Sequence, residues 1–196
     1  MTGLDAIILT GGQGSRLGGA DKAALIGVDG LTTLQRTVVA CREVNAGRVV
    51  VVGPPHTAGE LDVEVTQESP PGSGPAAAIA AGWALLESDG SVGGDVLVLA
   101  CDMPNVASGV KALVGAGCGA DGAIAVDGGQ KQWLLALLRR AALAKACASL
   151  DWGSGAGNPS VKRLLGGLDL AEVAVPPGAA DDLDTPEDLS SLGYTS

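Results

Sequence analysis

Short, unbroken apolar runs alternate with longer amphipathic or alanine-rich segments along most of the chain. The runs are rich in Val, Ile and Leu, which is typical of strands buried on both faces. The segments between them have the length and apolar spacing of helices. We therefore predict strands over residues 6–9, 48–52, 95–100, 123–126 and 170–175, and helices over about 32–44, 76–86, 139–149 and 159–165 and from residue 186.

This alternation favours an α/β fold with a mostly parallel sheet that helices cover on both faces. No internal repeat or linker interrupts the pattern, so we expect residues 1–196 to form a single domain. In sheets of this kind ligands bind beyond the carboxyl ends of the strands. The residues that directly follow each predicted strand are therefore the first candidates for chemistry.

The charge balance excludes several classes of partner. The chain carries 12 Lys and Arg against 22 Asp and Glu, a formal net charge of −10, and a protein this acidic repels the phosphate backbone of DNA or RNA. No apolar run approaches the roughly 18 residues of a membrane-spanning helix, and the first residues lack the cationic start of a signal peptide. The four cysteines form no Cys-x-x-Cys pair, so we expect reduced, mostly buried thiols. We expect a cytoplasmic protein that binds neither nucleic acid nor membranes.

The loop after the first predicted strand combines glycines with two cations. Residues 9–22 read Leu-Thr-Gly-Gly-Gln-Gly-Ser-Arg-Leu-Gly-Gly-Ala-Asp-Lys, so Arg16 and Lys22 accompany backbone N–H groups that glycine can turn toward an anion. A Walker A motif is excluded because the chain holds no Gly-Lys pair, and a dinucleotide fingerprint fails at Leu17, where a third glycine belongs. The loop predicts a phosphate cradle, with an ordinary solvent loop as the alternative.

Carboxylates follow the strand predicted over 95–100 and recur near the C-terminus. Asp102 lies in Cys-Asp-Met-Pro, and a carboxylate at the end of a buried strand is costly unless it caps a helix or meets a cation. It is therefore either a helix cap or a Mg²⁺ ligand, because Mg²⁺ takes one or two carboxylates with phosphate oxygens and water. Asp182 and Asp184 precede the helix start Thr-Pro-Glu, and capping and metal ligation are equally open for them.

Taken in order, these motifs resemble the nucleotidyltransferases of the molybdenum cofactor pathway, the MobA-like guanylyltransferases. The matching segments are Leu-Thr-Gly-Gly at 9–12, Ser-Arg-Leu-Gly at 15–18, Asp-Lys at 21–22, Gly-Pro-Ala-Ala-Ala at 74–78, Cys-Asp-Met-Pro at 101–104 and Asp-Leu-Asp-Thr-Pro-Glu-Asp-Leu at 182–189. Residues 132–137, Gln-Trp-Leu-Leu-Ala-Leu, are similar to the family's middle strand, which helps shape the acceptor side. The resemblance runs over nearly the whole chain.

The resemblance implies a Rossmann-like three-layer α/β sandwich with a mostly parallel central sheet. Its N-terminal half would bind GTP and its C-terminal half molybdopterin. The implied reaction is Mg²⁺-dependent attack of the molybdopterin phosphate on the α-phosphorus of GTP, with release of pyrophosphate. Such a transfer needs positioning and charge neutralisation rather than a general base, since the nucleophile is already a phosphate oxygen.

Residue by residue, the resemblance assigns catalysis to Arg16, Lys22 and Asp102. It assigns nucleotide binding to Leu9, Gly11, Gly12, Gly14, Ser15, Arg16, Lys22, Gly74, Pro75 and Asp102. The expected cofactor is Mg²⁺, held by Asp102 and by Asp184 or Asp182. GTP and molybdopterin are the expected small-molecule partners, and molybdoenzymes or chaperones the expected transient protein partners.

Departures from the family pattern keep alternatives open. Thr10 and Leu17 stand where the family has Ala and Met, which both positions tolerate, whereas Gly-Pro-Pro-His at 53–56 is unusual for the segment that contacts guanine. The base is therefore open, although the paired glycines and the Asp-Lys pair of the first loop favour guanine over the cytosine of related cytidylyltransferases. A sugar phosphate or another pterin as acceptor, and a non-catalytic GTP-binding paralogue, are further alternatives.

Overall fold

A seven-stranded sheet forms the centre of the computed structural model, which describes residues 3–10, 21–88, 90, 94–149 and 159–195. The described strands are β1 (Leu4–Leu9), β2 (Val49–Val52), β3 (Glu64–Thr66), β4 (Asp95–Ala100), β5 (Gly122–Asp127), β6 (Gln130–Arg139) and β7 (Leu170–Ala174). The described helices are the short 3₁₀ helix η2 (Lys22–Ala24), α1 (Thr33–Glu43), α2 (Pro75–Glu87), α3 (Val106–Ala116), α4 (Arg140–Ser149), α5 (Val161–Leu165) and α6 (Pro186–Leu192).

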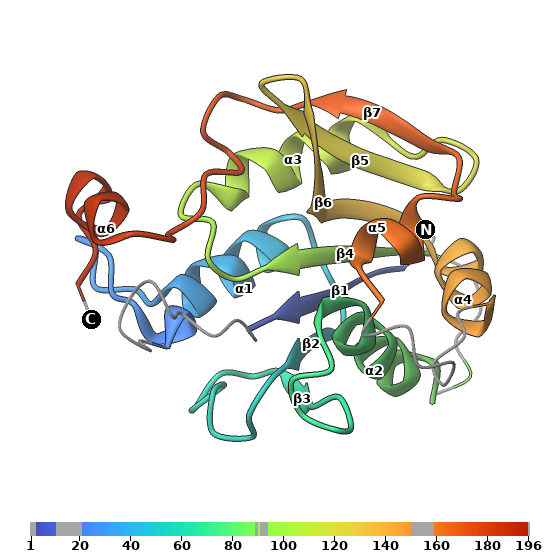
Figure 1. The fold of residues 1–196 in the computed structure, drawn as a ribbon, viewed down its shortest axis with the longest axis horizontal. Helices are drawn as coiled ribbons and strands as arrows, with labels where there is room; N and C mark the ends of the chain where they lie inside the picture. The colour runs from blue at the N-terminus through green and yellow to red at the C-terminus, as the bar shows by residue number, and fades with distance from the viewer. Residues whose placement is uncertain (1–2, 11–20, 89, 91–93, 150–158, 196) are drawn as a thin grey trace.

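The strands lie in the order β3-β2-β1-β4-β6-β5-β7. β1 pairs in parallel with both β2 and β4, and β2–β3 and β5–β7 are also parallel. Of the described strands, β6 alone is reversed, since it pairs antiparallel with β4 and with β5. The carboxyl ends of the other strands therefore share one edge of the sheet, and Figure 1 shows β1 and β4 pointing toward the side where α6 lies.

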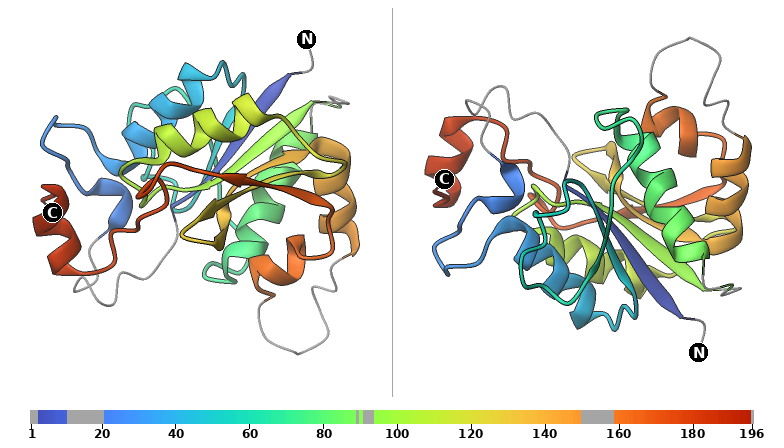
Figure 2. Two further views of the ribbon diagram at one scale, coloured as in Figure 1. Left: turned by 90° about the horizontal axis from the view of Figure 1, so that it is seen from above. Right: turned by 90° about the horizontal axis from the view of Figure 1, so that it is seen from below.

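Helices cover both faces of the sheet and so make three layers (Figure 2). α1 and α3 pack on one face, and α2, α4 and α5 on the other. Successive side chains of β1 point to opposite faces, so Ile8 joins the first cluster and Ile7 the second. The expected α/β sandwich with a mostly parallel central sheet is confirmed.

Most predicted elements are present within a residue or two of their expected bounds. The sequence analysis missed β3, which is short and partly exposed, and assigned no range to α3, whose two internal glycines weaken its helical signal. In the described part of the chain, no helix is long and apolar enough to span a bilayer.

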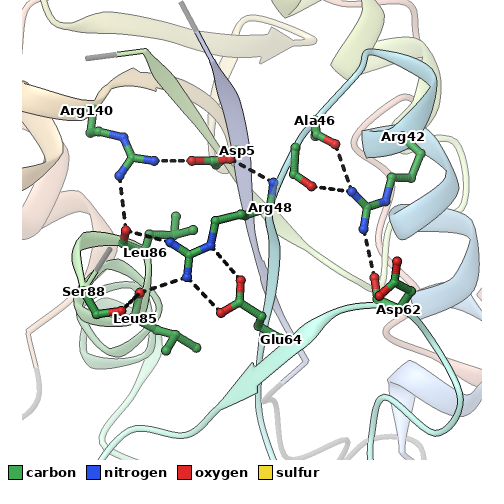
Figure 3. A network of polar contacts seen from close by, with 11 residues as sticks. Asp5, Arg42, Ala46, Arg48, Asp62, Glu64, Leu85, Leu86, Ser88 and Arg140 are labelled. Atoms are coloured by element: carbon green, nitrogen blue, oxygen red, sulfur yellow. Dashed lines mark hydrogen bonds and ion pairs between the residues drawn. The ribbon is translucent and has the colours of Figure 1, made fainter. Parts of the chain in front are cut away.

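Two arginines join α2 and α4 to the sheet at its amino edge, opposite the candidate site (Figure 3). Arg48 donates to the Leu86 and Leu85 carbonyls at the end of α2, at 2.9 and 3.1 Å, and pairs with Glu64 of β3. Arg140 is buried, forms an ion pair with Asp5, and lies 5.5 Å from the centre of the Trp83 ring. These cations stabilise the fold and lie away from the strand ends where a ligand is expected.

Candidate functional site

Three charged side chains from distant parts of the sequence meet at the carboxyl edge of the sheet. Lys22 begins η2, Asp102 follows β4, and Asp184 precedes α6. The Lys22 Nζ donates to Asp102 Oδ2 at 2.8 Å and also forms an ion pair with Asp184 Oδ1. The ammonium therefore bridges the two carboxylates, and its side chain is only 13% exposed.

Hydrogen bonds from backbone N–H groups help to position this cluster. Asp21 caps η2 by accepting from the Ala23 N–H, which fixes the start of the turn that carries Lys22. The Leu183 N–H donates to the Asp102 carbonyl at 3.0 Å, so the C-terminal segment is tied directly to the end of β4. This cluster is preorganised by the fold.

The electrostatics of the cluster follow from its excess of acid. Burial by itself lowers the pKa of the Lys22 ammonium, but its hydrogen bonds to Asp102 and Asp184 and their charges outweigh burial, and the pKa is raised. Asp182 lies at the exposed rim of the pocket, where the surrounding protein removes part of its hydration. This desolvation is the larger cause, and the negative charges of Asp102 and Asp184 add to it, so that the pKa of the Asp182 carboxyl is raised to about 6. In the part of the chain that the structure describes, Lys22 thus faces three carboxyl groups.

A pocket of about 320 Å³ opens beside this cluster. Its floor is made by the ends of the central strands, namely Leu9 and Thr10 after β1 and the segment 100–103 after β4. Lys22, Val161, Asp182 and residues 131–134 of β6 complete the lining. The volume lies at the lower end of the range for small-molecule sites, which is roughly 300–1,000 Å³.

The β6 wall departs from regular pairing where it meets the pocket. Ala136 pairs with Ile124 of β5, whereas the next pair along β5 joins Ala125 to Gln132. Within the described strands, Trp133 and Leu134 have no Cα partner on β4 or β5. Such irregularities are common next to binding sites because they redirect side chains, and here they bring Trp133 to the pocket lining.

The described positions agree with part of the expected site. Leu9, Lys22 and Asp102 line the pocket together. Gly74 and Pro75 do not line it; Gly74 is the N-cap residue of α2, and Pro75 is the first residue of that helix. Five expected phosphate ligands lie outside the described residues: Gly11, Gly12, Gly14, Ser15 and Arg16. The assignment of Arg16 to catalysis therefore stays a prediction.

Helix capping accounts for some of the acids and not for others. Asn105, not Asp102, is the N-cap residue of α3, and the Asp102 carboxylate meets a cation instead. Thr185 caps α6, and Asp188 completes the capping box by accepting from the Thr185 N–H. These bonds lower the pKa of the Asp188 carboxyl. Capping therefore uses Asp188 and leaves Asp182 and Asp184 facing Lys22.

The donor set suits Mg²⁺ only in combination with a ligand. Among the described residues, no group of three or more His, Cys, Asp or Glu has the arrangement of a complete metal site. Mg²⁺ does not need one, because it commonly takes one or two carboxylates and completes its shell with phosphate oxygens and water. Asp102 and Asp184 can supply those carboxylates, so the residues present fit Mg²⁺ bound together with a phosphate.

The sequence analysis did not single out Lys131, which lines the pocket from β6 and pairs with Glu172 of β7 at 2.9 Å. Site residues are expected in the segments that follow each parallel strand. β6 runs antiparallel, so its amino end, not its carboxyl end, lies at this edge. Nothing in Gln-Lys-Gln-Trp-Leu at 130–134 reveals that direction.

Comparison with known proteins gives a family match along most of the chain. The family model described as MobA-like NTP transferase domain matches residues 6–171. No curated protein matches the chain at a significant level.

Several solved structures share the fold at low sequence identity. Molybdopterin-guanine dinucleotide biosynthesis protein A from Archaeoglobus fulgidus is 20% identical with a TM-score of 0.67, and the match covers 96% of each chain. A nucleotidyl transferase from Methanothermobacter thermautotroptrophicus is 18% identical with a TM-score of 0.73, over 97% of this chain and 95% of that one. The 4-diphosphocytidyl-2C-methyl-D-erythritol synthase is 16% identical with a TM-score of 0.63, over 97% of each chain.

Proposed function

The chain belongs to the MobA-like NTP transferase domain family and is a nucleotidyltransferase, and from this premise we propose that it transfers GMP from GTP to the phosphate of molybdopterin. In this reaction an acceptor phosphate oxygen attacks the α-phosphorus of GTP. The new P–O bond forms as the bond from the α-phosphorus to the bridging oxygen breaks, and pyrophosphate leaves. Atoms and charge balance without a redox partner or a general base.

The observation that carries this proposal is the meeting of Lys22, Asp102 and Asp184 beside a pocket at the carboxyl edge of the sheet. Phosphoryl and nucleotidyl transfers need positioned charge more than covalent chemistry from the protein. Lys22 supplies a point charge for the phosphates. Asp102 and Asp184 would hold Mg²⁺, which when bound would withdraw charge from the phosphate oxygens around the reacting phosphorus.

The β6 wall of the pocket is suited to hold an acceptor. Trp133 presents an aromatic side chain to the same pocket as Lys22 and Asp102, in a chain that has three Trp, one Tyr and no Phe. A flat heterocycle such as a pterin can stack on an indole, and such pairs contribute roughly 0.5–1.5 kcal/mol beyond the buried area. This wall favours a ring-bearing acceptor over a sugar phosphate.

The test separates the donor from the acceptor. Thermal shift with GTP, CTP, ATP and UTP, each with Mg²⁺, should give the largest rise in melting temperature with GTP. Pyrophosphate release should then require molybdopterin and should not occur with a sugar phosphate. A preference for CTP would indicate a cytidylyltransferase, and turnover with a sugar phosphate alone would indicate a sugar-phosphate nucleotidyltransferase. Nucleotide binding without pyrophosphate release with any acceptor would indicate a non-catalytic paralogue.

A further inference from the structure

From the position of the Lys22 ammonium we infer that it occupies the place of the metal in the ligand-free protein and excludes divalent cations until a triphosphate arrives. The inference rests on the proposed use of a metal-bound triphosphate. Its basis is geometric, since Nζ contacts one oxygen of Asp102 at 2.8 Å and one of Asp184. Both carboxylates thus already share a cation.

The two cations would compete for the same two carboxylates. Lys22 and Asp102 are 13% and 20% exposed at their side chains, so water screens their interaction only partly. A Mg²⁺ ion held by Asp102 and Asp184 would lie within a few ångströms of the ammonium, where like charges repel. Mg²⁺ therefore binds only when the ammonium leaves the carboxylates.

A triphosphate provides the alternative partner that the ammonium needs. When no triphosphate is bound, moving Lys22 away from the carboxylates would break two charge-assisted hydrogen bonds. It would also leave a largely buried cation unpaired, which is costly. When a triphosphate is bound, the ammonium can transfer to phosphate oxygens while Mg²⁺ takes the carboxylates. Lys22 thereby couples metal binding to triphosphate binding, and by linkage each ligand strengthens the binding of the other.

The remaining charge explains why the exchange requires both ligands. Among the described residues, Lys22 faces the carboxyl groups of Asp102, Asp182 and Asp184 and can neutralise only one of them. A triphosphate arriving alone meets these excess carboxylates and is repelled. A triphosphate arriving with Mg²⁺ brings the cation that the carboxylates require.

The test is a Mg²⁺ titration of the nucleotide-free protein by isothermal titration calorimetry. Lys22→Met should bind Mg²⁺ about tenfold or more tightly than the wild type, because the competing charge-assisted bonds are gone. Lys111→Met is the matched control, since it also removes one lysine charge but Lys111 pairs with Glu43 and does not line the pocket; its Mg²⁺ affinity should equal that of the wild type. Equal Mg²⁺ affinity in Lys22→Met and the wild type would overturn the inference.

Two additions keep the result decisive. If Lys22→Met does not fold, Lys22→Gln, which keeps hydrogen-bond donors without the charge, replaces it, and Mg²⁺ should raise its melting temperature more than that of the wild type.

Tripolyphosphate carries the triphosphate charge without a base, so Mg²⁺ should strengthen its binding to the wild type far more than to the Lys22 variant. Equal enhancement in both proteins would contradict the coupling. These readouts use neither GTP nor an acceptor, so a failed guanylyltransferase assay leaves them interpretable.

Discussion

Asp95 and Asp102 stand at opposite ends of β4, and only the second lies at the pocket. Asp95 starts the strand and pairs with Arg139 at 3.1 Å, whereas Asp102 follows it and pairs with Lys22. Asp102→Asn should reduce pyrophosphate release about 100-fold or more, because removing one positioned charge from such a site costs that much. The fold should persist, since Lys22 keeps its contact with Asp184.

Asp95→Asn provides the control for that measurement, because it neutralises an acid on the same strand without touching the pocket. It should leave the turnover rate unchanged. Near-normal turnover by Asp102→Asn, with circular dichroism confirming the fold of both variants, would remove Asp102 from the chemistry.

Asp182 gives the ligand-free protein a specific pH dependence. Its folded-state pKa of about 6 lies above the ordinary value of 3.8, so between these values the native state binds more protons than the unfolded chain. Stability therefore falls as the pH rises through this window. Asp182→Asn should be as stable as the wild type near pH 4 and melt about 1–3 °C higher near pH 8, a small shift because the group is partly exposed. A variant that melts lower than the wild type at pH 8 would contradict the repulsion argued here.

At the scale of elements, the irregular segment of β6 is what brings an aromatic ring to the pocket. Trp133→Ala should raise the KM for the acceptor several-fold and leave the KM for the nucleotide unchanged, whereas Trp133→Phe should recover most of the loss. Trp83 is the control, because it is a buried residue of α2 whose ring contacts Arg140 rather than the pocket. Trp83→Phe should lower the melting temperature without affecting either KM. If Trp133→Ala raised both KM values by the same factor, the β6 wall would not be specific to the acceptor.

α4 and β1 are joined by a buried ion pair whose partners can be removed singly or together. Arg140 and Asp5 are 6% and 14% exposed at their side chains. Arg140→Met should cost about 3–5 kcal/mol of unfolding free energy because it leaves Asp5 buried without its cation. Adding Asp5→Asn should recover more than half of that loss, since Asn keeps an acceptor for the Arg48 N–H. Denaturant unfolding of the single and double variants measures both values, and strictly additive losses would contradict the pairing.

The elements differ in how far the sequence predicts them. Runs such as 95–100 are continuous and apolar, so hydrophobic patterning alone locates β4 at its observed bounds. Strand direction has no such signal, and the reversal of β6 placed Lys131 outside the sequence-based search. The approach of Lys22 to Asp184 is likewise a tertiary event across 162 positions. Asp102, with Asp184 or Asp182, is predicted as a metal ligand, and Lys22 is predicted to act with Asp102 at the same site; the direct ion pairs of Lys22 with Asp102 and Asp184 are not predicted.

At the scale of the whole molecule, the C-terminal segment packs against the residues that follow Lys22 through a hydrophobic cluster of its own. Leu25, Leu183 and Tyr194 form this cluster apart from the two that flank the sheet. Ile26 and Thr195 exchange backbone hydrogen bonds at 2.8 and 2.9 Å, and Arg36 lies 5.8 Å from the centre of the Tyr194 ring. We call residues 24–27 and 183–195 the clasp. It holds Asp184 and borders Lys22.

Because the clasp has its own small cluster, we expect it to open without unfolding the sheet. Tyr194→Ala should accelerate hydrogen exchange at amides of the clasp while those of β1 and β4 stay protected. Nucleotide affinity should fall roughly three- to tenfold, since opening lowers the fraction of molecules with Lys22 and Asp184 in place. Leu113→Ala, in the fully buried core under α3, is the matched control and should lower global stability while leaving nucleotide affinity unchanged. Exchange that rises equally in the clasp and in β1 after Tyr194→Ala would show that the two unfold as one unit, and the site would then be no more mobile than the sheet that carries it.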